Sequence, residues 1–183
     1  MEPQTVSTRT YAMHFGAYMG IYWTLKFILL PLSFTIPFLS FLFIGLTLGV
    51  PFMGYYYLKS FRDKYCGGYI SFSKAMIFVI LVYFFASMIV SVAHFIYFQY
   101  IDDGLVFNAI KSTSDQLLAL NENSADYDLL KDTFSELLTS WNDLTATDIT
   151  LANFSRNIYI GFILSIPTAI LGKRIAKPTN LEE

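Results

Sequence analysis

Three basic side chains fall inside long apolar stretches of this 183-residue sequence, where a charge is costly. Lys26, His94 and Arg156 each lie about five to seven residues from the expected outer end of their stretch, or roughly 7 to 10 Å at 1.5 Å per residue. At a shared depth they could converge on one anion: a lipid phosphate, an acidic substrate or carboxylates of this chain. In the simpler interpretation, Lys26 and Arg156 extend separately to the membrane surface while His94 is hydrogen-bonded inside the protein.

No sequence signature of catalysis accompanies these residues. The chain contains no G-x-x-x-x-G-K-[ST], no H-E-x-x-H and no G-x-S-x-G pattern. His14 and His94 are expected near opposite faces of the membrane, and the single Cys66 cannot form a disulfide within the chain. We therefore predict no catalytic or metal-binding residues, no cofactor, no nucleic-acid partner and no enzymatic activity.

Four long apolar segments must position the three basic side chains. The chain is 55% hydrophobic and 14% charged, whereas soluble domains average about 25% charged residues. The segments cover about 11–30, 36–58, 72–100 and 149–171, and each is near the roughly 20 residues that a membrane-spanning helix needs. We therefore predict an all-α membrane protein with a bundle of four transmembrane helices. Residues 1–100 hold the first three, 101–148 form an external insertion, and 149–183 hold the fourth helix with a basic tail.

The charges are distributed unevenly along the chain. Ten carboxylates lie between Asp102 and Ser155, against two lysines, Lys111 and Lys131. Positive charges cluster instead around the second connection and after the fourth segment, at Lys59, Arg62, Lys64, Lys74, Lys173, Arg174 and Lys177. The positive-inside rule then predicts that both termini are cytoplasmic and that the insertion 101–148 is external.

The external insertion has the pattern of a helical hairpin. Its second half places apolar residues on one helix face, at Leu130, Phe134, Leu137, Leu138 and Trp141. Ser124 or Asp126 is a candidate cap for this helix, residues 121–124 a candidate turn, and residues 105–120 a less regular first helix. The apolar faces can pack on each other, lie on the bilayer, or bind a membrane or periplasmic protein through residues 105–141. Thr145 and Asp148 match a capping pattern that would start the fourth helix slightly outside the membrane.

Small residues and one proline mark the first two segments. Gly16 and Gly20, and likewise Gly45 and Gly49, have the G-x-x-x-G spacing that lets two membrane helices approach closely. We interpret both pairs as packing surfaces. Pro51 is expected to kink the second helix, as static geometry rather than as a transport hinge.

The loop before the third segment carries a family resemblance. Residues 61–75 have the sequence FRDKYCGGYISFSKA. This resembles the signature of the domain-of-unknown-function 4199 family, in which an arginine-containing stretch leads to GGxISFGxA and then a long span. Ser73 stands where that signature has its third glycine. The resemblance implies a small four-span inner-membrane protein of the Bacteroidota type, with an external helical insertion. It implies no activity, ligand or catalytic residue.

The same loop has a physical interpretation. Gly67 and Gly68 permit a tight turn with positive φ, and Ser71 or Ser73 can cap the third helix. Arg62 is expected at the anionic lipid surface. The alternative is a cytoplasmic contact motif formed by Arg62, Gly67, Gly68 and Ser71.

These patterns predict a non-enzymatic structural or accessory protein of the bacterial inner membrane that acts through protein or lipid contacts. The alternative is a small transporter or channel, as a homo-oligomer, because four helices alone make a narrow pathway.

Overall fold

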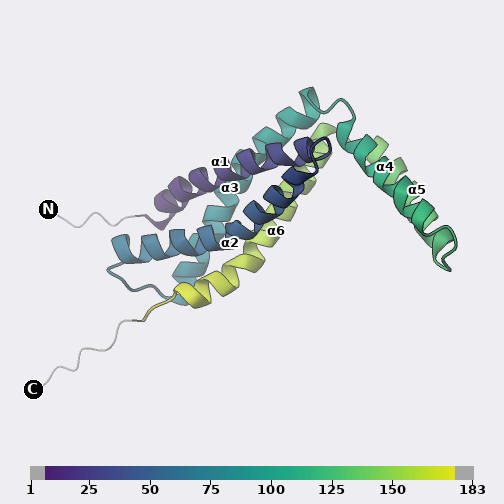
Figure 1. Cartoon of the computed structure of the whole chain (residues 1–183). Coiled ribbons are helices and arrows are strands. Elements are labelled where there is room, and N and C mark those ends of the chain that lie inside the picture. Colours follow the sequence, from purple (N-terminus) through teal and green to yellow (C-terminus); the bar gives the residue numbers. More distant parts are fainter. Residues whose placement is uncertain (1–6, 176–183) are drawn as a thin grey trace, which may run out of the picture.

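Within residues 7–175, which are the residues described, the computed structural model contains six α-helices (Figure 1). They are α1 (Thr8–Ser33), α2 (Phe38–Tyr65), α3 (Phe72–Tyr100), α4 (Leu105–Leu120), α5 (Tyr127–Asn142) and α6 (Ala146–Gly172). α1, α2, α3 and α6 form a bundle, and each is long and apolar enough to cross a membrane. The helical hairpin of α4 and α5 leaves one end of this bundle at a steep angle to its long axis (Figure 1). The predicted fold class is confirmed.

The two ends of the bundle differ in what they carry. At the hairpin end, α3 finishes, α4 and α5 project, and α6 begins. At the loop end lie the start of α1, the α2–α3 connection and the last residue of α6 (Figure 1). The chain therefore crosses the bundle four times and brings both ends of its described part to the loop end.

The helices run beyond the apolar segments that predicted them. α2 continues past Leu58 to Tyr65, and α6 begins at Ala146. Helical hydrogen bonding continues until a cap ends it, whereas the apolar pattern marks only the buried or lipid-facing length. At α6 the predicted cap is confirmed: Thr145 Oγ1 accepts from the Asp148 N–H (3.2 Å), and Asp148 Oδ2 accepts from the Thr145 N–H (2.9 Å).

α3 is the central helix, and it packs against α1 and α6. A Cβ added at Gly16 of α1 would lie 2.6 Å from Phe85 Cβ, and one at Gly161 of α6 would lie 2.6 Å from Tyr83 Cβ. Only glycine allows these helix backbones to come so close. The packing interpretation of the α1 glycines is confirmed, since Gly20 meets α3 in the same way, at Ile89.

The same interpretation is wrong for Gly45 of α2, and Gly49 packs against a side chain of α1 rather than against a helix backbone. A Cβ at Gly45 would meet no atom within 4 Å, and one at Gly49 would meet only the Tyr22 hydroxyl, at 3.3 Å. α2 lies at the edge of the bundle (Figure 1), and its large side chains Phe41 and Phe52 are each 74% exposed. The G-x-x-x-G spacing makes a helix face flat, but it does not determine whether another helix covers that face.

Pro51 lies inside α2 without ending it. In the preceding turn, the Tyr22 hydroxyl of α1 donates to the Leu46 carbonyl of α2 (2.7 Å). This carbonyl is not the one that Pro51 leaves without a helical donor, which belongs to Thr47 four residues earlier. The bond therefore joins α1 to α2 next to the proline without replacing the missing helical bond.

The α4–α5 hairpin has a shallow interior. Leu130, Phe134, Leu138 and Trp141 are half-buried where the two helices pack together, but Leu137 is exposed. Asp126 occupies the N-cap position of α5, yet neither it nor Ser124 makes the predicted side-chain cap. The backbone of Asp126 is not in the extended conformation that directs a capping side chain toward the first turn.

Candidate functional site

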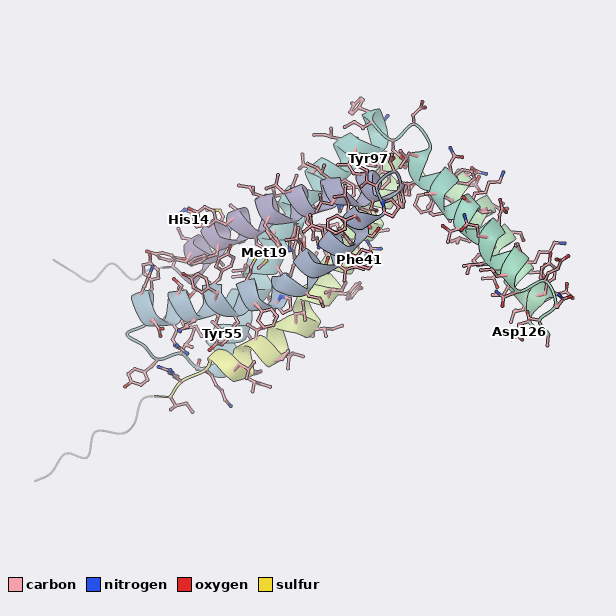
Figure 2. The ribbon with its side chains drawn as sticks, viewed as in Figure 1. His14, Met19, Phe41, Tyr55, Tyr97 and Asp126 are labelled. Carbon is pink, nitrogen blue, oxygen red and sulfur yellow. The ribbon has the colours of Figure 1, made fainter. Side chains whose placement is uncertain are left out.

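A cavity of about 440 Å³ lies at the hairpin end, between α1, α2, α3, α6 and the base of the hairpin. Lys26, His94 and Arg156 all line it, so the structure brings together the three basic residues found inside apolar segments. His14 lies toward the opposite end of the bundle from Tyr97, which lines the cavity (Figure 2). A cavity of this volume is within the range of ligand sites.

Lys26 reaches the cavity from α1 and is half-buried. Its Nζ lies 5.8 Å from the ring centroid of Trp23 and 5.2 Å from that of Phe43 on α2. Trp23 and Lys26 are three residues apart and therefore share a helix face. The two rings attract the ammonium group through their quadrupoles, but they supply no opposite charge.

Arg156 reaches the cavity from α6 and is exposed. Its Nη2 donates to Asn153 Oδ1, one turn earlier in the same helix, at 2.6 Å. A guanidinium carries five N–H donors in a planar fork, and this bond uses one of them. Asn153 orients the group while most of its donors stay available.

His94 reaches the cavity from α3 and is 7% exposed. Its ring meets Phe27 edge-on at a centroid distance of 4.3 Å, and its buried Nδ1 has no hydrogen-bond partner among the described residues. The buried Nε1 of Trp23 also lacks a partner there. Such atoms normally bond to protein, water or a ligand, so both point to an interaction that this chain alone does not supply.

The lining contains the basic side chains Lys26, His94 and Arg156 and, within the part of the chain described, no carboxylate. Asp102, at the base of the hairpin, is engaged elsewhere: its Oδ1 accepts from the Tyr97 hydroxyl (3.1 Å) and from the Val106 N–H (3.1 Å). Asp148 is held in the α6 capping box. The carboxylates of the insertion therefore do not neutralise the cavity, which removes one of the three anions considered from sequence.

At the loop end, Arg62 is placed differently from the prediction. It is 2% exposed rather than at the lipid surface. Its Nε and Nη2 donate to the Asp63 carboxylate at 2.7 and 3.2 Å, and its Nη1 donates to the carbonyl of Gly172, the last residue of α6, at 2.8 Å. The carbonyls at a helix C-terminus lack helical partners and carry partial negative charge, so they attract a cation inward.

The glycines after α2 form the tight turn predicted for them. Gly67 and Gly68 have φ of +62° and +84°, and a Cβ on either would meet nothing within 4 Å. Backbone conformation, not space, is what requires glycine here. Ser71, rather than Ser73, is the N-cap of α3 and accepts from the Lys74 N–H at 3.4 Å.

Beyond the turn, the chain pairs with the segment after α6. The Ile70 N–H donates to the Arg174 carbonyl (2.9 Å), and the Arg174 N–H donates to the Ile70 carbonyl (3.0 Å). These two hydrogen bonds join the α2–α3 loop to the segment that follows α6.

The family model described as "Protein of unknown function (DUF4199)" matches residues 14–174. The chain belongs to the DUF4199 family. The match spans both the cavity and the loop-end motif on which the resemblance rested. Comparison of this DUF4199 protein with curated proteins and with solved structures gave no match.

Sequence reasoning missed several features of the DUF4199 protein. Trp23 and Asn153 each lie three residues before a predicted basic residue, a spacing that could have indicated them. Trp141 was assigned only to the hairpin face, but it also lines the cavity. The bonds from Arg62 to Gly172 and from Ile70 to Arg174 join distant parts of the chain, and no local pattern indicates them.

Proposed function

We propose that this DUF4199 protein is a non-enzymatic accessory component of the bacterial inner membrane. It acts through protein contacts made by the α4–α5 hairpin and through lipid contacts made by the bundle. The observation that carries this proposal is the hairpin itself, which packs mainly on itself and projects from the bundle (Figure 1). It presents large exposed side chains near its tip, with Leu120 83% and Leu129 68% exposed.

We further propose that the hairpin end faces the periplasm. The loop end carries Lys59, Arg62, Lys64, Lys74, Lys173 and Arg174, whereas the hairpin carries mostly carboxylates. The positive-inside rule assigns a cytoplasmic side to the loop end. Lys177, which contributed to the same prediction, lies outside the described residues.

Two cysteine variants test this orientation in a Cys66→Ser background. Ser124→Cys in the hairpin turn should react with a membrane-impermeant maleimide in cells whose outer membrane is permeabilised. Lys64→Cys at the loop end should react only after the inner membrane is also opened. The reverse pattern would contradict the proposed orientation.

The interior of the bundle argues against transport through a single copy. Phe61 stacks on Phe78 at a centroid distance of 4.2 Å, and the Tyr83 side chain is 1% exposed. The close helix contacts at Gly16 and Gly161 leave no room for a path beside α3. A solute would have to separate the most tightly packed helices of the molecule.

Site-specific photo-crosslinking in cells tests the hairpin contact. A photoreactive residue at Leu129 on α5 should give one discrete protein adduct. The matched control is Leu48, which is 65% exposed on α2 but faces the membrane, and it should give none. Equal crosslinking from both positions, or none from Leu129, would contradict an accessory role through the hairpin.

A further inference from the structure

We propose that the cavity at the hairpin end binds a phospholipid, with the phosphate between Lys26 and Arg156 and part of an acyl chain on the apolar wall. This deepens the lipid-contact part of the proposed function. It does not depend on the hairpin having a protein partner.

The basic lining of the cavity favours the binding of an anion. Lys26 and Arg156 line one space together, and within residues 7–175 the only ion pair is Arg62–Asp63 at the other end. Uncompensated cations in a membrane-spanning segment are unfavourable, and an anion shared between them offsets both. A phosphate suits this pair, because arginine binds it through two parallel N–H bonds and lysine as a point charge.

The unpartnered buried nitrogens restrict the ligand further. Trp23 Nε1 and His94 Nδ1 belong to side chains that are each 7% exposed, and both residues line the cavity. An indole Nε1 can only donate, so its partner must be an acceptor oxygen. The ester and phosphate oxygens of a phospholipid are acceptors, and they extend over several atoms along the molecule. The Trp23 nitrogen thus favours an oxygen-rich head group rather than a cation, and His94 Nδ1 offers a second polar contact beside it.

The remaining wall is apolar and long. On α6 the lining extends from Ile149 to Leu164, which is roughly 22 Å along the helix at 1.5 Å per residue. Val50, Val90 and Leu164 contribute apolar surface in the part of the lining farthest from the hairpin. A free phosphate ion would leave this surface uncovered, whereas an acyl chain would bury it. The combination of paired cations with an apolar wall is what distinguishes an amphiphile from a soluble anion.

Lipid binding by the purified full chain provides the test. Native mass spectrometry would count bound phosphatidylglycerol on the wild type, on the Lys26→Gln/Arg156→Gln double variant and on a Lys59→Gln/Lys111→Gln control. The control removes the same charge from two exposed lysines that do not line the cavity. We expect one tightly held lipid on the wild type and on the control, and binding at least roughly tenfold weaker on the double variant. Equal binding by all three proteins would overturn the proposal, because the lipid would then belong to the general membrane annulus.

Two further arms identify the source of the phosphate. Leu164→Phe should reduce lipid retention by filling the apolar wall while leaving both cations in place. Millimolar inorganic phosphate should fail to displace the lipid from the wild type. Displacement by inorganic phosphate, with lipid retention by Leu164→Phe unchanged, would instead indicate a site for a soluble anion and overturn the proposal of a phospholipid.

If the double variant does not fold, Arg156→Gln alone serves, since that side chain is exposed. Loss of lipid binding should leave the Leu129 crosslink unchanged. The lipid proposal and the hairpin-contact proposal can therefore fail independently of each other.

Discussion

The two ends of the bundle differ in how an arginine side chain is paired. At the loop end, Arg62 is 2% exposed, and its Nε, Nη1 and Nη2 all donate to acceptors of this chain, Asp63 and Gly172. At the hairpin end, Arg156 makes one bond to the neutral Asn153, and Lys26 interacts with aromatic rings. A cation satisfied by its own chain holds the architecture together. The pair of cations without a counter-charge is where we propose that a ligand binds.

The difference comes from what surrounds each cation. At the loop end, the last residue of α6 places its Gly172 carbonyl at Arg62, and the adjacent Asp63 supplies a carboxylate. At the hairpin end, the nearby carboxylates Asp102 and Asp148 are occupied by hydrogen bonds within the hairpin base and the α6 cap. Arg62 is therefore paired within the chain, whereas Lys26 and Arg156 line a cavity.

The largest expected loss of stability is that of Arg62→Ala. The variant removes three donors and leaves the Gly172 carbonyl without its side-chain partner, so the melting temperature should fall by roughly 5–10 °C. Thermal unfolding in detergent measures it, with the exposed neighbour Lys64→Ala as the control. A melting temperature equal to that of the control would show that Arg62 does not hold α2 and α6 together.

The next largest loss of stability is expected for Gly67→Ala and Gly68→Ala. Each forces a Cβ into a positive-φ conformation, which costs roughly 1–2 kcal/mol per residue, so the yield and the melting temperature of folded protein should fall. Gly45→Ala is the matched control, because that glycine is helical with open space around it. Normal stability of the loop variants, together with loss of a cellular phenotype, would favour the contact-motif interpretation instead.

Thr145→Ala should have a smaller, local effect. Loss of the capping box costs about 1 kcal/mol and should loosen the first turn of α6 next to the cavity. Hydrogen exchange of the amides of residues 147–149 should become faster, while Thr147→Ala, an exposed change in the same turn, should leave it unchanged. Unaltered exchange in Thr145→Ala would show that packing alone orders this turn.

The smallest effect on the lipid-free protein is expected for Arg156→Gln. Because the group is exposed and lacks an ion partner, the change in stability should stay within about 0.5 kcal/mol. Added phosphatidylglycerol should then raise the melting temperature of the wild type more than that of the variant, by mass action. A lipid-free destabilisation as large as that of Arg62→Ala would remove the contrast between the two ends.

Local patterns predicted much of the fold. The four apolar segments, the amphipathic hairpin and the Thr145–Asp148 capping box depend on neighbours within a few residues, and all were found. The common depth of Lys26, His94 and Arg156 could also be counted along each helix. The direction in which each side chain points around its helix could not be counted, because packing against other helices sets it.

The errors have the same origin. Arg62 was expected at the lipid surface, because its sequence neighbourhood is basic and gives no sign of Gly172, which lies 110 residues later. Gly45 and Gly49 were expected to pack because their spacing is the same as that of Gly16 and Gly20, but α3 covers only the α1 pair.

The sequence by itself determined that this chain forms four membrane-length helices with an acidic hairpin, because hydrophobic length and periodicity are local properties. It also determined that costly basic groups lie inside those helices. Only the tertiary structure decided which of them find a partner, because this depends on how the helices rotate and on where their ends meet. Arg62 is paired within the chain and holds α2 to α6, while Lys26 and Arg156 line the cavity for which we propose a phospholipid.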